Sequence, residues 1–189
     1  MTLLLIGHIL GIALGAGGAT MSDILFLTSI TDNFLDTSEL RLLKKASHVV
    51  IVGLFLLYVT GFGFIILNPV GLSQRFWAKA TIVTILTING FVMHRRVFPI
   101  LEKFTANKTP LSSASFHSHS CLFIWTGTIS AISWYTALIL GAWRTLTLSY
   151  GVIMGLYFAA IIWAVAIART LFYYFWGAYR TQQAQLPKM

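Results

Sequence analysis

The stretch Ile6 to Asp23, IGHILGIALGAGGATMSD, decides the fold of this chain. It lies inside an apolar first segment, and its glycines at four-residue intervals are Gly7, Gly11 and Gly15. In a water-exposed helix each glycine costs roughly 1 kcal/mol relative to alanine. In a bilayer, a glycine face lets a neighbouring helix or a flat cofactor come close to the backbone. The stretch therefore predicts a membrane helix with a central packing surface.

The composition of the whole chain also indicates an integral membrane protein. The 189 residues are 57% hydrophobic and 10% charged, and the mean hydropathy is +0.80. A soluble domain of this size does not bury so much apolar surface. No long linker or low-complexity tract divides the sequence, so we expect one membrane domain over residues 1–189. The single cysteine, Cys121, excludes an internal disulfide and multi-cysteine metal sites.

Apolar segments separated by polar connectors predict an all-α bundle of five transmembrane helices. Each segment has about 20 or more apolar residues, enough to cross roughly 30 Å of hydrocarbon. The expected spans are 2–30, 46–67, 76–98, 116–142 and 146–176. Asn68-Pro69 and Pro99 are expected to end the second and third spans. Thr37 or Ser38 is expected to cap a short amphipathic turn within the polar connector 31–45.

The basic residues predict how the bundle is oriented. With five spans, three of the thirteen Lys and Arg residues fall on the side of the N-terminus, namely Arg75, Lys79 and Arg144, and the other ten fall on the opposite side. The positive-inside rule then places the N-terminus outside and the C-terminus in the cytoplasm. We expect a multi-pass protein of the bacterial inner membrane. The formal net charge of +8 is explained by this topology and by anionic lipid, and not by nucleic acid.

Ionisable residues inside the spans are the first candidates for function, because they are costly there and usually face a cavity or a protein interior. His8 and Lys79 lie about a turn or more inside the first and third spans, at similar depth. Asp23 lies toward the other end of the first span. Lys79 and Asp23 are candidate catalytic residues. The alternatives are that Lys79 extends outward to the interface, and that Asp23 sits in the headgroup layer or pairs with Arg95 or Arg96.

The other histidines gather near the opposite boundary, on three different spans. They are His48, His94, His117 and His119. Imidazoles brought together in one layer are ligands for a metal ion or for haem iron. We expect metal ligation from among His8, His48, His94 and His117. His48 and His94 are candidates for a second site or for an inner-face haem edged by Arg95 and Arg96. The alternative for each is an ordinary polar residue at the membrane boundary.

Two short motifs resemble a known family. The pattern H-x-x-G at His8 and Gly11 with a following Gly-Gly, and RFWAK over residues 75–79, are similar to HemJ-type membrane protoporphyrinogen oxidases and related CopD-like bacterial proteins. The similarity covers roughly the first hundred residues. It implies haem b binding, with His8 and Lys79 as functional residues, and we expect His8 to be the preferred axial ligand and Lys79 its polar partner. The glycine face at Gly11 and Gly15 would then lie against the flat cofactor, and one haem is expected rather than two.

Three functions are compatible with these residues. The first is a haem b redox protein that transfers electrons or coupled protons, an oxidoreductase with a quinone or a porphyrin as partner. The second is a CopD-like permease or binder of a transition metal, which would use the inner histidines with Met93 and Cys121. The third is a non-catalytic subunit of a homo-oligomer or larger membrane complex, packed through small residues such as Gly151 and Gly155. The chain has no Walker, HExxH or GxSxG motif, which argues against nucleotide and classical hydrolase chemistry.

Overall fold

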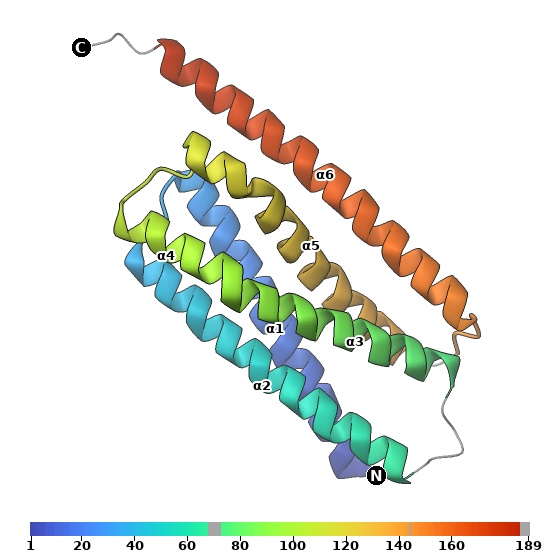
Figure 1. The fold of residues 1–189 in the computed structure, drawn as a ribbon. Helices are drawn as coiled ribbons and strands as arrows, with labels where there is room; N and C mark the ends of the chain where they lie inside the picture. Colours follow the sequence, from blue (N-terminus) through green and yellow to red (C-terminus); the bar gives the residue numbers. More distant parts are fainter. Residues whose placement is uncertain (68–72, 144, 186–189) are drawn as a thin grey trace.

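The computed structural model describes residues 1–67, 73–143 and 145–185, with side chains as far as Tyr174. Over these residues the chain is helical, without strands (Figure 1). The elements are α1 (Thr2–Asp32), α2 (Thr37–Leu67), α3 (Gln74–Val92), a π-helical turn η2 (Met93–Val97), α4 (Phe98–Ala106), α5 (Ala114–Ala142) and α6 (Tyr150–Gln185). α3, η2 and α4 form one continuous helix. Five helices are thus long and apolar enough to cross a membrane, which confirms the all-α class and the five candidate spans.

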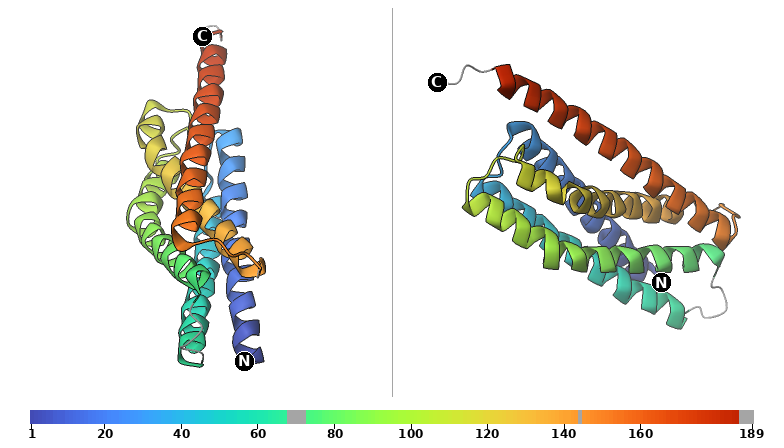
Figure 2. Two further views of the ribbon diagram at one scale, coloured as in Figure 1. Left: turned by 90° about the vertical axis from the view of Figure 1, so that its right-hand side faces the viewer. Right: turned by 45° about the horizontal axis from the view of Figure 1, so that its top comes forward.

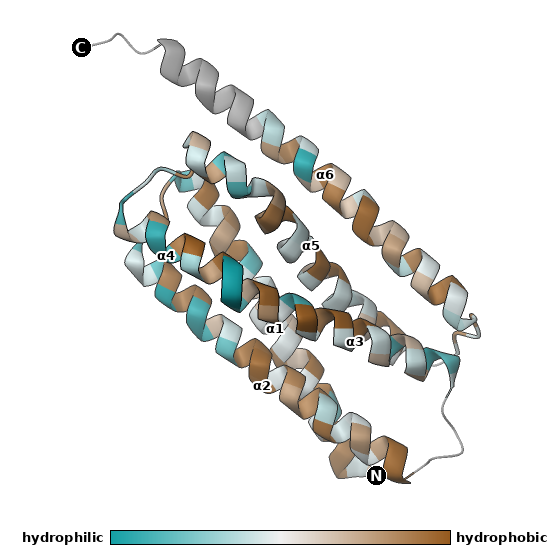
Figure 3. Ribbon diagram, viewed as in Figure 1, coloured by the Kyte–Doolittle hydropathy of each residue, from teal (hydrophilic) through white to brown (hydrophobic). Residues whose placement is uncertain are grey.

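The helices run back and forth along one bundle axis. α1 packs along α2, the third helix packs on α5, and α6 lies at the periphery against α5 and α3 (Figures 1 and 2). We call the end that contains the start of α1 the N-terminal end. The end that contains the α1–α2 and α4–α5 connections is the connector end. Hydrophilic residues concentrate toward the connector end, whereas the middle of the helices is mostly hydrophobic (Figure 3).

The glycines of α1 lie in close contact with α2 and α5. A Cβ atom on Gly53 of α2 would lie 2.6 Å from the Gly15 nitrogen and 2.7 Å from the Gly11 oxygen. A Cβ on Gly15 would lie only 1.9 Å from the ring of Trp134, whose side chain is fully buried. The packing surface predicted for the first span is therefore present. Its contacts at Gly11 and Gly15 are made by Gly53 and Trp134, so protein fills the face where a cofactor was expected.

α2 begins in what the sequence indicates is a polar connector. Its first turn carries a capping box: the Ser38 amide donates to the Asp36 carboxylate at 3.3 Å, and the Asp36 amide donates to the Glu39 carboxylate at 2.9 Å. The buried Ser29 hydroxyl of α1 donates to the same Glu39 carboxylate at 3.1 Å. The cap is therefore Asp36, and not Thr37 or Ser38 as expected. Glu39 of the box also binds Ser29, which joins the start of α2 to α1. The amphipathic turn and the second span form one helix, α2.

The third span continues past Pro99, where it was expected to end. The Phe98 amide donates to the Met93 carbonyl, five residues back, and this closes a π-helical turn immediately before the proline. In a regular α-helix the Pro99 ring would clash with the carbonyl four residues earlier. The wider turn relieves that clash, so the helix runs on to Ala106. Similarly, α6 starts later than predicted, at Tyr150, and continues to Gln185. Residues 68–72 and Arg144, in the two other predicted connections, lie outside the described residues.

Three clusters of buried side chains hold the helices together. At the connector end, α2, α4 and α5 pack around aromatic residues such as Phe98, Phe104 and Phe116. At the N-terminal end, α3, α5 and α6 pack around Ile82 and Tyr157. Between these clusters lies a smaller one around Trp134. The arrangement leaves α2 facing the third helix with little direct packing in mid-span, and this is where a cavity lies.

Candidate functional site: a cavity between four helices

An elongated cavity of about 450 Å³ lies between α1, α2, the α3–η2–α4 helix and α5. It follows α2 from Leu43 to Tyr58 and the third helix from Leu86 to Leu101. At 1.5 Å per residue this is a length of roughly 22 Å. α1 and α5 form the back wall, and most of the lining side chains are apolar. The volume lies within the range of about 300–1,000 Å³ that is typical of small-molecule and cofactor sites.

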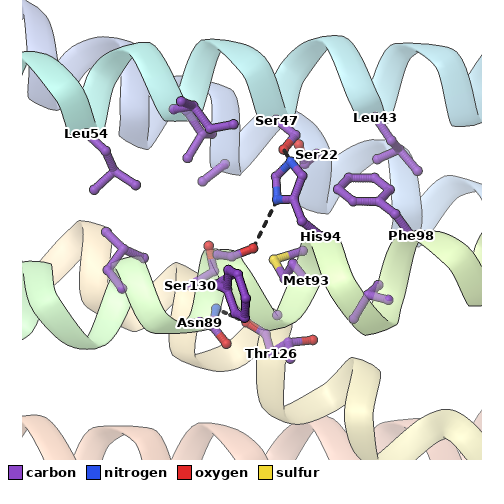
Figure 4. Close-up of a pocket in the computed structure, with 18 of the residues that line it drawn as sticks. Ser22, Leu43, Ser47, Leu54, Asn89, Met93, His94, Phe98, Thr126 and Ser130 are labelled. Atoms are coloured by element: carbon purple, nitrogen blue, oxygen red, sulfur yellow. Dashed lines mark hydrogen bonds between the residues drawn. The ribbon is translucent and has the colours of Figure 1, made fainter.

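His94, on the π-helical turn, is the one imidazole among the residues lining this cavity. Its Nδ1 atom lies 3.0 Å from the Gly90 carbonyl oxygen and its Nε2 atom 3.2 Å from the Ser47 hydroxyl of α2 (Figure 4). Because a carbonyl can only accept, Nδ1 carries the proton and Nε2 accepts from Ser47. The bond to Gly90 fixes the tautomer, so Nε2 is the ring nitrogen that can accept a hydrogen bond or, without Ser47, bind a metal.

Asp23 of α1 is the one carboxylate in the cavity wall. Its side chain is half-buried and makes no hydrogen bond or ion pair with the residues that the structure describes. In particular, the expected pair with Arg95 or Arg96 is not formed. Asn89, by contrast, is satisfied, since its side-chain amide donates to the Thr126 carbonyl at 2.9 Å. An ionisable group without a partner inside an apolar helix bundle indicates a functional site.

The π-helical turn places several side chains in the cavity at once. Met93, His94 and Val97 all line it from this single turn. π-helical turns are rare and occur frequently at functional sites, because the extra residue changes the direction of the side chains that follow. The sequence identifies His94 as a candidate but not the turn or Ser47. Pro99, which we interpreted as a helix end, was the available signal for the turn.

His8 does not line this cavity. Its Nδ1 atom lies 2.8 Å from the Thr60 hydroxyl, which itself donates to the Leu56 carbonyl at 2.6 Å. The hydroxyl proton is therefore used, and the imidazole donates through Nδ1. The ring also meets Phe64 edge-on, with ring centroids 5.5 Å apart. Lys79, like His8, does not line the cavity. The contacts of His8 with Thr60 and Phe64 hold it against α2 near the N-terminal end, away from the cavity.

The remaining predicted histidines make separate contacts. The exposed His48 has its Nδ1 atom 2.6 Å from the carbonyl of Lys44 on its own helix. His117 packs on Phe172 and Tyr173 of α6, with centroids 5.7 and 5.6 Å apart. In the described part of the chain, no group of three or more His, Cys, Asp or Glu residues is placed to hold a metal ion. The predicted ligands His8, His48, His94 and His117 therefore form no such group.

Arg95 and Arg96 are both exposed, next to His94. The Arg95 guanidinium lies over the Phe91 ring, 4.8 Å from its centroid, and Phe91 lines the cavity. Comparison with known proteins adds nothing to these contacts, since no family model, curated protein or solved structure matches the chain. The resemblance to HemJ-type and CopD-like proteins stays a prediction from short motifs. The function has to be inferred from the cavity itself.

Proposed function

We propose that the protein is a multi-pass membrane redox protein that binds a b-type haem in this cavity, with its N-terminus outside and its connector end in the cytoplasm. The observation that carries the proposal is the His94 imidazole, which lines a largely apolar cavity of cofactor size and whose Nδ1 proton is held by Gly90, so that Nε2 is the basic nitrogen. The ten basic residues predicted for the cytoplasmic side support the orientation.

The donor set of the cavity fits a haem. His94 would hold the iron through Nε2, with the Gly90 carbonyl as the outer hydrogen-bond partner that histidine ligands of metals usually have. Ser47 gives up its bond to Nε2 when a ligand takes its place. Arg95 and Arg96, exposed beside His94, supply positive charge for carboxylate groups. When bound, haem iron supplies a one-electron couple tuned by its ligand and surroundings.

Asp23 has a separate role in this proposal. A carboxyl group in an apolar cavity takes up or releases a proton when the charge of a neighbouring group changes, because an unbalanced charge is costly there. Asp23 would therefore hold the proton that accompanies electron transfer. Replacing it by Asn should leave the absorption spectrum intact but weaken the pH dependence of the midpoint potential. An unchanged pH dependence in Asp23→Asn would remove Asp23 from the mechanism.

The absorption spectrum of the detergent-purified protein tests the site. We expect a Soret band that shifts on reduction by dithionite, and its loss in His94→Ala. His48→Ala is the matched control, because His48 makes the same contact to its own helix but lies outside the cavity. If His8→Ala removes the band and His94→Ala does not, the haem lies at the N-terminal end instead. A colourless protein that does not bind added haemin would contradict the proposal.

A further inference from the structure

The cavity reaches the surface of the molecule between α2 and α3. Three of its large hydrophobic lining side chains are themselves largely exposed: Ile51 at 47% and Phe55 at 64% on α2, and Phe91 at 60% on α3. On the opposite wall, the lining residues Ala19 of α1 and Thr126 of α5 are buried. The cavity is therefore closed at the back and open at the side. We call this opening the window and define it by Ile51, Phe55, Gly90 and Phe91.

Two hydrogen bonds between helices frame the window. Toward the N-terminal end, the Tyr58 hydroxyl lies 3.0 Å from the Thr87 hydroxyl. Toward the connector end, Ser47 meets His94 at 3.2 Å. Beyond Ser47, the cavity continues to Leu43, Phe98 and Leu101, and these lining side chains are buried in the connector-end cluster. The opening is thus confined to the middle of both helices.

The surface around the window is apolar. Val52, Val59 and Phe62 on α2 and Ile88 on α3 are large, exposed and hydrophobic. In a bilayer these residues face hydrocarbon, so the window opens to lipid and not to water. Phe55 stands on one side of it and Phe91 on the other. The Arg95 guanidinium over the Phe91 ring orients this second aromatic side chain.

We propose that the cavity exchanges its ligand with the bilayer through this window, so that the site takes a membrane-dissolved, largely apolar ring compound. Phe55 and Phe91 are the two aromatic side chains that a ligand passes on entry. The polar groups of Ser47, His94 and Asp23 then meet the polar atoms of the ligand inside. The inference rests on the cavity of the proposed function, but it requires neither iron nor ligation by His94.

The rate at which a metal-free porphyrin enters the protein tests this inference. Wild-type protein in phosphatidylcholine vesicles is mixed with vesicles that contain protoporphyrin IX, and the porphyrin emission is followed over time. Larger rings at the window should obstruct entry, so the double variant Phe55→Trp, Phe91→Trp should slow uptake about tenfold. The amount finally bound should not change. The double variant Phe55→Ala, Phe91→Ala should take up the porphyrin faster than wild type.

Phe62→Trp is the matched control, because Phe62 is a lipid-facing aromatic residue of the same helix, 61% exposed, that does not line the cavity. An equal slowing in this control, no slowing in the tryptophan double variant, or no uptake at all would overturn the inference. The haem proposal is judged separately. If the protein shows no Soret band but the window variants change porphyrin uptake, the haem proposal fails and the window proposal stands. If the protein shows a Soret band but the window variants do not change uptake, the window proposal fails and the haem proposal stands.

Discussion

At the scale of single residues, the histidines show how little a side chain's type says about its role. His48, His94 and His119 each hold the carbonyl four residues back in their own helix through Nδ1. His8 instead bonds Thr60 on a neighbouring helix. What distinguishes His94 is its position beside a cavity, which depends on the π-helical turn that carries it. The position of each histidine along its helix could be predicted from the sequence, but the direction in which its side chain points could not.

The glycine contacts predict a sharp difference between two neighbouring substitutions. A Cβ on Gly15 would overlap the buried Trp134 ring, whereas one on Gly17 would meet no atom within 4 Å. Gly15→Ala should therefore lower the free energy of unfolding by about 1–3 kcal/mol through overpacking. Gly17→Ala should be neutral or slightly stabilising, since alanine favours the helix. Thermal unfolding of both variants in the same detergent measures the difference, and equal transition temperatures would show that α1 does not pack on Trp134.

The Asp36 cap predicts a response to acid. Hydrogen bonds from the Ser38 side chain and from the amides of Thr37 and Ser38 hold the pKa of the Asp36 carboxyl below its ordinary value of 3.8. A lowered pKa in the folded state stabilises the fold above the unfolded pKa, and this contribution disappears as the pH falls through the folded value. Asp36→Asn should thus be less stable than wild type at neutral pH, with the difference shrinking below about pH 4. Thermal melts across this range test it; a difference that grows in acid would contradict the cap.

At the scale of elements, the decisive feature is the continuous helix from Gln74 to Ala106. Pro99 and the run His94-Arg95-Arg96 resemble the end of a span, and local rules predict one. Instead, a single π-helical turn absorbs the proline, and α4 packs Phe98, Leu101 and Phe104 into the connector-end cluster. Packing of these three side chains outweighs the local cost of the proline. The same turn brings His94 to Ser47, so one irregularity serves both the fold and the site.

Adding one residue to the π-helical turn should uncouple its two halves. The turn already holds one residue more than a regular turn, so an alanine inserted after the exposed Arg96 would rotate α4 by about 100° relative to α3. Phe98, Leu101 and Phe104 would then leave the cluster, so we expect a strongly destabilised protein. Arg96→Ala keeps the number of residues and removes only the side chain, and it should unfold near the wild-type temperature. Normal stability of the insertion variant would mean that the register of α4 is not set by this cluster.

At the scale of the whole molecule, five antiparallel helices place the start of α1 and the end of α6 at opposite ends (Figure 1). This follows from an odd number of helices and does not depend on the details of packing. Which end faces the cytoplasm depends on charge. The ion pair Lys44–Glu102 and the charged residues around it lie at the connector end. The positive-inside rule predicts that this end faces the cytoplasm.

Labelling from one side of the membrane tests the orientation. In a Cys121→Ser background, the exposed connector residue Asn107 and the exposed Thr145 at the other end are replaced in turn by cysteine. An impermeant maleimide added to intact cells should label Thr145→Cys at once. Asn107→Cys should react only after the membrane is permeabilised. The reverse pattern would invert the orientation and would place Arg95 and Arg96 on the outer side, against the proposed function.

The sequence by itself determined the class of this protein: five long apolar helices and the polar residues within or beside them. Hydropathy and helix length are sums over neighbouring residues, so they can be predicted without any knowledge of packing. Only the tertiary structure decided that Gly11 and Gly15 contact Gly53 and Trp134, and that Asp23 and His94 share a cavity. Those outcomes depend on how each helix is rotated about its axis. That rotation is set by contacts between residues distant in the chain and, at His94, by a single extra residue in one turn.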